Sequence, residues 1–188
     1  MTDKNKLGVL LFLASEAIFF LILILSFIYF RDSWINASSP NPGSNLNILF
    51  TGIFSIALWG SSGTVWFAER SSKHGNSLLL KLGLAATIIL GATFLVGQGL
   101  EYARLLQSNV TISQNLFGTT FFTLTGFHGF HVLVGLTILA ILLGLTLAGG
   151  PHAPGANAVG AVALYWHFVD LVWVVIFSIV YVWTFVLL

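Results

Sequence analysis

The sequence predicts an all-α polytopic membrane protein with five transmembrane helices in one bundle, and two observations support this. The first is composition: 57% of the 188 residues are hydrophobic and only 7% are charged, whereas a soluble domain carries about 25% charged residues. The second is the presence of five apolar segments, each long enough to cross a hydrocarbon core of about 30 Å with about 20 residues. A water-facing surface cannot be built from this composition, so the chain is expected to lie in a membrane.

The five helices are predicted near residues 7–30, 46–68, 78–106, 118–147 and 159–187. Short polar connections separate them, such as SSPNPGSN after the first helix and GGPHAPGAN after the fourth, and such residues are typical of turns. No connection is long enough to form a domain, so residues 1–188 are interpreted as a single transmembrane helical domain. The leading MTDKNK enters an apolar run without a small-residue cleavage site, which is typical of a first spanning helix rather than a removed signal peptide.

The distribution of basic residues predicts the orientation in the membrane. The side that holds the N-terminus and the second and fourth connections carries Lys4, Lys6, Arg70, Lys73 and Lys81. The other side carries Arg31 and Arg104. Because basic residues concentrate on the cytoplasmic side, we expect a cytoplasmic N-terminus and a C-terminus outside. The absence of an organelle transit sequence favours the inner (plasma) membrane of a bacterium.

Composition also excludes several classes of function. The net charge is +1 and the basic residues are scattered, which predicts no binding of nucleic acid. The chain has no cysteine, which excludes disulfides, thiolate metal sites and cysteine nucleophiles. No nucleotide-binding loop and no broken helix pair of the transporter type is present. Function must therefore be sought in the polar residues of the apolar segments.

Glu16 lies about nine residues into the first apolar segment, roughly 13 Å along a helix. A charge at the middle of a bilayer costs about 2.5–3.5 kcal/mol, and no lysine or arginine lies within a helical turn of it. Glu16 is therefore either protonated or paired with a group from another helix, for which His128 and His131 are the candidates. Two alternatives for Glu16 remain equal. One is a proton-relay or lipid-contacting site, and the other is a hydrogen bond that sets the register of two helices.

His128 and His131 lie three residues apart, so both imidazoles occupy neighbouring parts of one helix face. A haem with two histidine ligands needs imidazoles that converge from different helices, and His167 on the fifth helix could supply one. No carboxylate cluster or open coordination set accompanies these histidines. Hydrogen bonding within the bundle is therefore favoured over metal or haem ligation.

Two further polar sets are predicted to act in helix packing. Gln98, Glu101 and Arg104 follow at three-residue steps, which predicts a Glu101–Arg104 ion pair along one helix face. His167 and Asp170 are also three residues apart and can form a hydrogen bond in a buried seam. A structural role is favoured for both sets. For His167 and Asp170 the alternative is a proton-carrying role.

Several longer motifs resemble one known family, and they occur over nearly the whole chain in the same order. They are ASEAIFF around Glu16, GQGLEY with Gln98 and Glu101, TIS at 111–113, GTTFFTLTGFHGFHVLVG from Gly118, and YWHFVDLVW from Tyr165. In these motifs the chain resembles subunit III of the haem-copper respiratory oxidases, and it is most similar to cytochrome c oxidase subunit III.

This resemblance implies a subunit without haem or copper, because those cofactors belong to subunits I and II, which reduce oxygen to water and pump protons. It implies direct packing against subunit I, bound phospholipids, and a role in sustaining proton uptake. The intramembrane glutamate of the family corresponds to Glu16, and its two histidines to His128 and His131. Many members have seven helices, and this chain would begin at their third; its first helix ends FRDSW, where many relatives have a histidine and two serines.

We therefore expect a non-catalytic subunit III of a terminal oxidase that serves aerobic electron transport, with no cofactor of its own. Expected partners are subunits I and II and membrane phospholipids, with subunit IV and a respiratory supercomplex as further candidates. The alternatives are subunit III of a quinol oxidase and the related accessory protein of nitric oxide reductase. A small proton-coupled transporter that uses Glu16 and Asp170, and a membrane haem protein, are the alternatives from other classes.

Overall fold

The computed structural model describes residues 3–37, 46–113, 116–150 and 154–183. Within these ranges the chain forms five long helices: α1 (Asp3–Ala37), α2 (Ile48–Lys73), α3 (Ser77–Gln107), α4 (Leu116–Ala148) and α5 (Ala156–Phe177). A π-helix, η3 (Ser178–Trp183), continues α5. All five helices are long and apolar enough to cross a membrane, so the predicted all-helical membrane bundle is confirmed.

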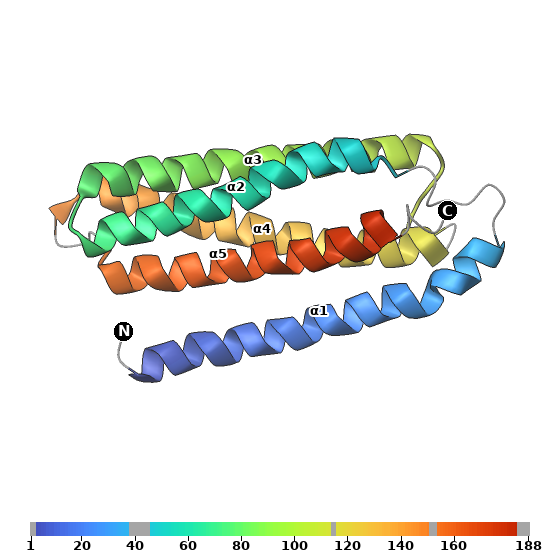
Figure 1. Ribbon diagram of the computed structural model, residues 1–188, viewed down its shortest axis with the longest axis horizontal. Helices are drawn as coiled ribbons and strands as arrows, with labels where there is room; N and C mark the ends of the chain where they lie inside the picture. The colour runs from blue at the N-terminus through green and yellow to red at the C-terminus, as the bar shows by residue number, and fades with distance from the viewer. Residues whose placement is uncertain (1–2, 38–45, 114–115, 151–153, 184–188) are drawn as a thin grey trace.

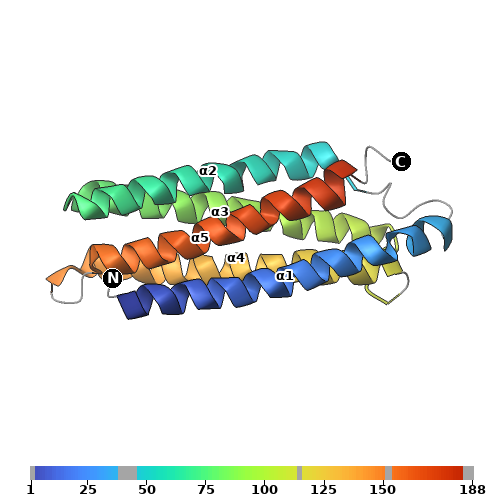
Figure 2. The ribbon, with the colours of Figure 1, turned by 60° about the horizontal axis from the view of Figure 1, so that its bottom comes forward.

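Helices α2, α3, α4 and α5 form a four-helix bundle, and α1 lies along its outside (Figure 1). The bundle is closed by packing of α2 on α3, α3 on α4, α4 on α5 and α5 on α2. Helix α1 packs mainly on α4 and α5, and the rotated view shows it running beside both (Figure 2). Helix α1 therefore joins the bundle mainly through α4 and α5.

The helix bounds differ from the predicted ones mainly at three ends. Helix α1 continues to Ala37, so the FRDSW stretch is helical. Helix α2 continues past residue 68 to Lys73, although Glu69 to Ser77 was predicted as a loop. The regular part of α5 ends at Phe177, and the predicted end at residues 184–187 lies outside the described residues.

The extension of α2 has a local electrostatic cause. Glu69 and Lys73 form an i,i+4 ion pair with 2.7 Å between Oε1 and Nζ, an arrangement that supports exposed helices. Arg70 and Lys73 also lie in the last turn of α2, where positive charge offsets the helix dipole. A charged stretch that the sequence predicts as a loop is therefore a stable helix end.

Short polar caps define the turn between α2 and α3. The side chain of Asn76 accepts a hydrogen bond from the Leu79 amide at 3.1 Å, which satisfies one of the free amides at the start of α3. Gly75 has a φ of +71°, a conformation that glycine adopts without steric cost. The resulting tight turn makes α2 and α3 antiparallel neighbours.

Small residues allow close helix approach in the bundle. A Cβ on Gly83 of α3 would lie 2.8 Å from the Cβ of Ala68 on α2 and 3.0 Å from its Cα. Gly91 and Gly135 leave room for the ring of Trp166, which a Cβ at either position would approach to less than 3 Å. In membranes, where helix association depends on packing rather than on the hydrophobic effect, such contacts are the usual basis of stability.

Two buried tryptophans of α5 are held by serines of α2. Trp166 Nε1 donates to Ser61 Oγ at 2.8 Å, and Trp173 Nε1 donates to Ser55 Oγ at 2.9 Å. These bonds satisfy polar groups that would be costly to leave unpaired in a bilayer. They set the register between α2 and α5 and thereby align the other polar residues of the two helices.

The connections between the helices lie at the two ends of the bundle, as predicted from the order of the apolar segments. The start of α1, the α2–α3 turn, the end of α4 and the start of α5 lie at one end, and the end of α1 lies at the other (Figures 1 and 2). Arg70, Lys73 and Lys81 are at the first end, and Arg31 and Arg104 are toward the second. The charge asymmetry used to predict orientation thus corresponds to two real ends of the molecule.

Candidate functional site

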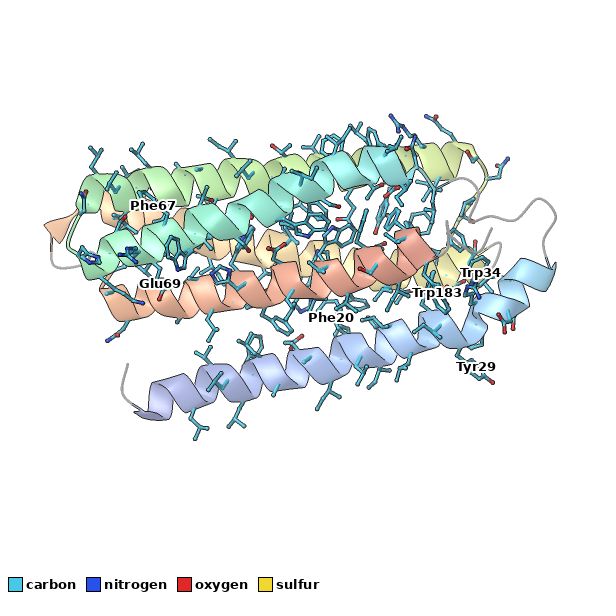
Figure 3. All side chains as sticks on the ribbon, in the orientation of Figure 1. Phe20, Tyr29, Trp34, Phe67, Glu69 and Trp183 are labelled. Carbon is cyan, nitrogen blue, oxygen red and sulfur yellow. The ribbon has the colours of Figure 1, made fainter. Side chains whose placement is uncertain are left out.

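Glu16 of α1 and His131 of α4 meet at the contact between their helices. Glu16 Oε2 lies 2.9 Å from His131 Nε2, and the side chains are 22% and 12% exposed. The ring of Phe20, one turn further along α1, packs edge-on against the His131 ring with 4.9 Å between centroids. Figure 3 shows Phe20 between α1 and the bundle. The structure therefore brings Glu16 to one of its two predicted partners.

The hydrogen bonds of His131 determine how protons are arranged in this pair. Nδ1 lies 2.7 Å from the backbone oxygen of Phe127, and because a carbonyl oxygen only accepts, Nδ1 carries a proton. Nε2 then either donates to the Glu16 carboxylate as an imidazolium or accepts a proton from the neutral Glu16 carboxyl. Both forms have no net charge and differ only in the position of one proton. The pair is thus compatible with the bilayer interior and can exchange a proton internally.

His128 has a different environment from His131. It is fully buried, and its ring stacks on Trp173 with 4.8 Å between centroids and an interplanar angle of 24°. Phe94 contacts it edge-on at 5.9 Å. Within the described residues, neither ring nitrogen has a hydrogen-bond partner. Glu16 therefore selects His131, and His128 is part of the aromatic core.

This difference predicts opposite effects for substitution of the two histidines by leucine. His128→Leu removes two polar atoms without a protein partner, so we expect unchanged or slightly higher stability of the bundle, by about 1 kcal/mol at most. His131→Leu leaves Glu16 without its partner and should lower stability by about 1.5–3 kcal/mol. Unfolding of each variant in mixed micelles of increasing SDS content, followed by tryptophan fluorescence, compares them. Equal destabilisation by both substitutions would contradict this assignment.

The Glu16–His131 pair borders a groove between α1, α4 and α5. The groove has a volume of about 420 Å³, within the range of small-molecule sites. Its walls are mainly apolar, with three polar side chains among the lining residues Val9, Phe12, Glu16, Phe130, His131, Val134, Ile138, Ala161, Val162 and Tyr165. The Tyr165 hydroxyl donates to the backbone oxygen of His131 at 3.0 Å. The groove can accept an apolar chain beside a polar pair.

Glu101 lies in a second polar cluster, between α2, α3 and η3. Its Oε1 accepts a hydrogen bond from Thr51 at 2.6 Å, and its Oε2 accepts one from Tyr181 at 2.5 Å. The predicted Glu101–Arg104 ion pair is wrong: the described residues show no such bridge, and the Arg104 guanidinium lies 3.8 Å from the ring centroid of Phe50. The i,i+3 spacing allows a local pair, but hydroxyl groups from two other helices satisfy the carboxylate.

Gln98 and Tyr102 form a third cluster, with Thr125 of α4. The Gln98 side-chain amide donates to the Thr125 backbone oxygen at 2.7 Å. The Tyr102 hydroxyl lies 2.7 Å from Thr125 Oγ1. Gly129 leaves the space for Gln98, because a Cβ there would lie 2.6 Å from Gln98 Oε1. Gln98 therefore connects α3 to α4, a packing role of the kind the sequence predicts for it.

His167 and Asp170 do not bond directly to each other in the described structure. Ser62 of α2 lies between them: its hydroxyl donates to Asp170 Oδ2, and its oxygen is 3.3 Å from His167 Nδ1. The spacing of three residues brings both side chains to one seam, as predicted. The connecting hydroxyl belongs to another helix.

Sequence reasoning missed the hydroxyl partners in these clusters. They are Thr51, Ser62, Thr125, Tyr165 and Tyr181. Each is a single serine, threonine or tyrosine in an apolar segment, and such residues occur in most membrane helices. A signal that could have found them is the requirement that every intramembrane acid find a partner.

Comparison with known proteins adds a family to this geometry. Residues 1–185 match the family model described as cytochrome c oxidase subunit III. The match therefore covers all the polar clusters described above.

Individual relatives agree with the family model. The chain is 36% identical to cytochrome c oxidase subunit 3 of Corynebacterium diphtheriae, over 94% of this chain and 86% of the relative. It is 35% identical to the protein of the same name from Synechocystis sp., over 95% of this chain and 76% of the relative. A fungal relative of that name, from Podospora anserina, is 38% identical over 95% of this chain and 67% of its own length.

Proposed function

The chain belongs to the cytochrome c oxidase subunit III family, and from this membership we propose that it is a non-catalytic subunit that packs directly against subunit I of its oxidase. The chain is a multi-pass membrane component of an oxidase complex. The relatives' names do not favour the quinol oxidase, nitric oxide reductase or transporter alternatives. In this proposal the haems and copper lie in subunits I and II, and the present chain binds none of them.

The observation that carries the proposal is the Glu16–His131 pair, which joins α1 to α4. Helix α1 otherwise presents large apolar side chains away from the bundle, among them Leu11, Ile18 and Ile22, each at least 60% exposed. Tyr29 also points away from the bundle (Figure 3). A helix with so much exposed apolar surface is suited to contact with lipid or with another membrane subunit. The pair holds that surface in a defined position.

We propose that the groove beside this pair holds an acyl chain of a membrane phospholipid. Its mainly apolar walls match a hydrocarbon chain, and Glu16, His131 and Tyr165 provide polar atoms at its border. We also propose contacts with subunit II, with subunit IV and with a respiratory supercomplex. The exposed apolar faces of the other helices are available for these contacts.

We also propose that the N-terminus is cytoplasmic, the C-terminus outside, and the membrane the plasma membrane of a bacterium. The excess of basic residues at the end with the α2–α3 turn supports this orientation. A single cysteine introduced at Gly75 should be labelled by a membrane-impermeant maleimide only after the cells are opened. Labelling of intact cells would reverse the orientation.

The test of the proposed role is Glu16→Gln in the complete oxidase. We expect the variant chain to be lost from the complex about tenfold faster during detergent washing, because a hydrogen bond to a charged partner is worth about 1.5–3 kcal/mol. The visible spectrum of the haems should not change. Ser15→Ala is the matched control, since Ser15 is exposed and donates only within α1, to the Phe12 backbone oxygen at 2.7 Å.

Two outcomes would contradict this proposal. Loss of the haem absorbance in the Glu16→Gln complex would show that the subunit is not peripheral to the redox centres. Equal retention of the Glu16→Gln and Ser15→Ala chains would show that the pair does not hold the subunit in place.

A further inference from the structure

The seam between α2 and α5 contains titratable side chains that are separate from the Glu16–His131 pair. Elsewhere on this seam neutral groups set the register, as in the Trp166–Ser61 and Trp173–Ser55 hydrogen bonds. At Ser62 the partners are instead a carboxyl group and an imidazole. Titratable groups inside a membrane are costly and usually functional. Neutral side chains would join the helices at a lower cost.

The direction of the hydrogen bonds in this set follows from the chemistry of Ser62. A serine hydroxyl has one proton, and Ser62 donates it to Asp170 Oδ2. The contact of 3.3 Å between Ser62 Oγ and His167 Nδ1 then requires Nδ1 to be the donor. The three groups therefore form a directed chain from His167 through Ser62 to Asp170.

Asp170 has a second oxygen that the helix packing does not use. The residue is 8% exposed, and within the described residues Oδ1 has no hydrogen-bond partner. Asp170 lies 14 residues after Ala156, roughly 21 Å along the helix and hence deep in the bilayer. A register clamp would satisfy both oxygens, whereas here Oδ1 has no partner among the described residues and Oδ2 is joined to the hydroxyl that leads to His167.

The other end of the chain leads toward the membrane surface. Glu69 of α2 lies beside α5, with its Oε1 3.3 Å from the position of a Cβ on Gly160; Figure 3 shows it on the part of α2 that faces α5. His167 is two turns after Gly160, and helical side chains lean toward the helix N-terminus. His167 therefore leans toward the end of α2 that holds Glu69. Glu69 in turn pairs with the exposed Lys73.

We propose that Glu69, His167, Ser62 and Asp170 form a proton-transfer chain from the end of α2 to the membrane interior, in which Asp170 stores the proton. The ligand of this site is a proton, supplied by water at the end of α2. The proposal uses none of the residues of the Glu16–His131 pair, and it stands independently of the role assigned to that pair.

In one transfer the neutral His167 imidazole, which carries its proton at Nδ1, takes a proton at Nε2 from hydronium at the end of α2 and gives its Nδ1 proton to Ser62 Oγ. Ser62 passes its own hydroxyl proton to Asp170 Oδ2 at the same time. The products are water, an imidazole protonated at Nε2, a restored serine hydroxyl and a neutral carboxyl group. The reverse sequence releases the proton to water and restores the imidazole protonated at Nδ1.

The experiment is infrared spectroscopy of the purified oxidase complex during exchange from H₂O to D₂O. A protonated carboxyl group has a carbonyl-stretch band that shifts on deuteration, and the Asp170→Asn complex identifies which band belongs to Asp170. The rate at which this band shifts measures proton access to Asp170. Ser62→Ala and His167→Gln remove links of the chain, and Ser71→Ala is the matched control, a serine on the same helix whose hydroxyl donates within α2, to the Phe67 backbone oxygen at 2.8 Å.

We expect the Asp170 band to be absent in Asp170→Asn and to exchange roughly 100-fold more slowly in Ser62→Ala and His167→Gln, the lower range of what a positioned proton carrier contributes. Ser71→Ala should exchange at the wild-type rate. If Asp170→Asn does not assemble, the band is identified by its frequency shift in Ser62→Ala, which loses the hydrogen bond to Oδ2. Exchange at the wild-type rate in Ser62→Ala and His167→Gln, or no Asp170 band at any pH, would overturn the proposal.

Discussion

Glu101→Ala is expected to destabilise the bundle by about 3 kcal/mol, one of the largest effects of any single substitution in this chain. The carboxylate accepts two short hydrogen bonds, from Thr51 and from Tyr181. Hydrogen bonds to charged groups contribute about 1.5–3 kcal/mol, and a buried donor left without a partner costs more. Tyr181 is only 2% exposed, so its hydroxyl has no route to water after the substitution.

The measurement is the free energy of unfolding in mixed micelles of increasing SDS content. Glu101→Gln keeps an oxygen and a similar shape, so it should retain part of the stability. Thr51→Val removes one donor and should cost less than Glu101→Ala. If Glu101→Ala and Thr51→Val proved equally mild, the carboxylate would not be the centre that joins α2, α3 and η3.

Gly83→Leu is expected to have a comparable effect through packing. The position of a Cβ on Gly83 is limited by the backbone of α2, because the nearest atoms include the Cα and backbone nitrogen of Ala68 at 3.0 and 3.1 Å. A flexible side chain could move aside, but here the two helices must separate. Overpacking of this kind costs about 1–3 kcal/mol and occasionally more, and the separation would also move the α2 serines away from Trp166 and Trp173.

Gly99→Leu is the matched control for this prediction. Gly99 lies on the same helix, and nothing is within 4 Å of the position of its Cβ. The two substitutions therefore share the gain in helix propensity over glycine and differ in the clash. The yield of assembled complex and the unfolding midpoint should fall for Gly83→Leu and hold for Gly99→Leu. The same loss in both variants would place the effect in lipid or partner contacts.

The spacing of polar residues along the chain predicted the partners of some of them and not of others, because spacing does not tell how the helices are rotated against one another. The spacing of His128 and His131 places both on neighbouring parts of α4, and nothing in that spacing tells which one faces α1. The rotation of α1 decides it: Glu16 bonds to His131, and Phe20 on the same helix lies closer to the His131 ring than to the His128 ring, with 4.9 and 6.3 Å between centroids. The Glu101–Arg104 prediction fails similarly: an i,i+3 pair on a helix surface is worth only about 0.2–0.5 kcal/mol, whereas the Glu101 carboxylate is buried and accepts hydrogen bonds from Thr51 and Tyr181 of other helices.

The π-helix η3 could not be foreseen from its residues, Ser178–Trp183. An apolar run of this kind is equally compatible with a regular helix. Tyr181 lies in this wider turn, and its hydroxyl donates to Glu101 of α3. Such turns often occur at functional or strained positions. Here the long-range hydrogen bond provides a reason for the local irregularity.

The sequence by itself determined that the chain is a five-helix membrane protein, where the helices lie, and which family its motifs match. Those features depend on hydropathy, length and residue order, which are properties of single segments. The tertiary structure alone decided that Glu16 pairs with His131, that Glu101 is held by Thr51 and Tyr181, and that Ser62 connects His167 to Asp170. Each of these depends on helix rotation and register, which are set by the close packing of side chains from different segments.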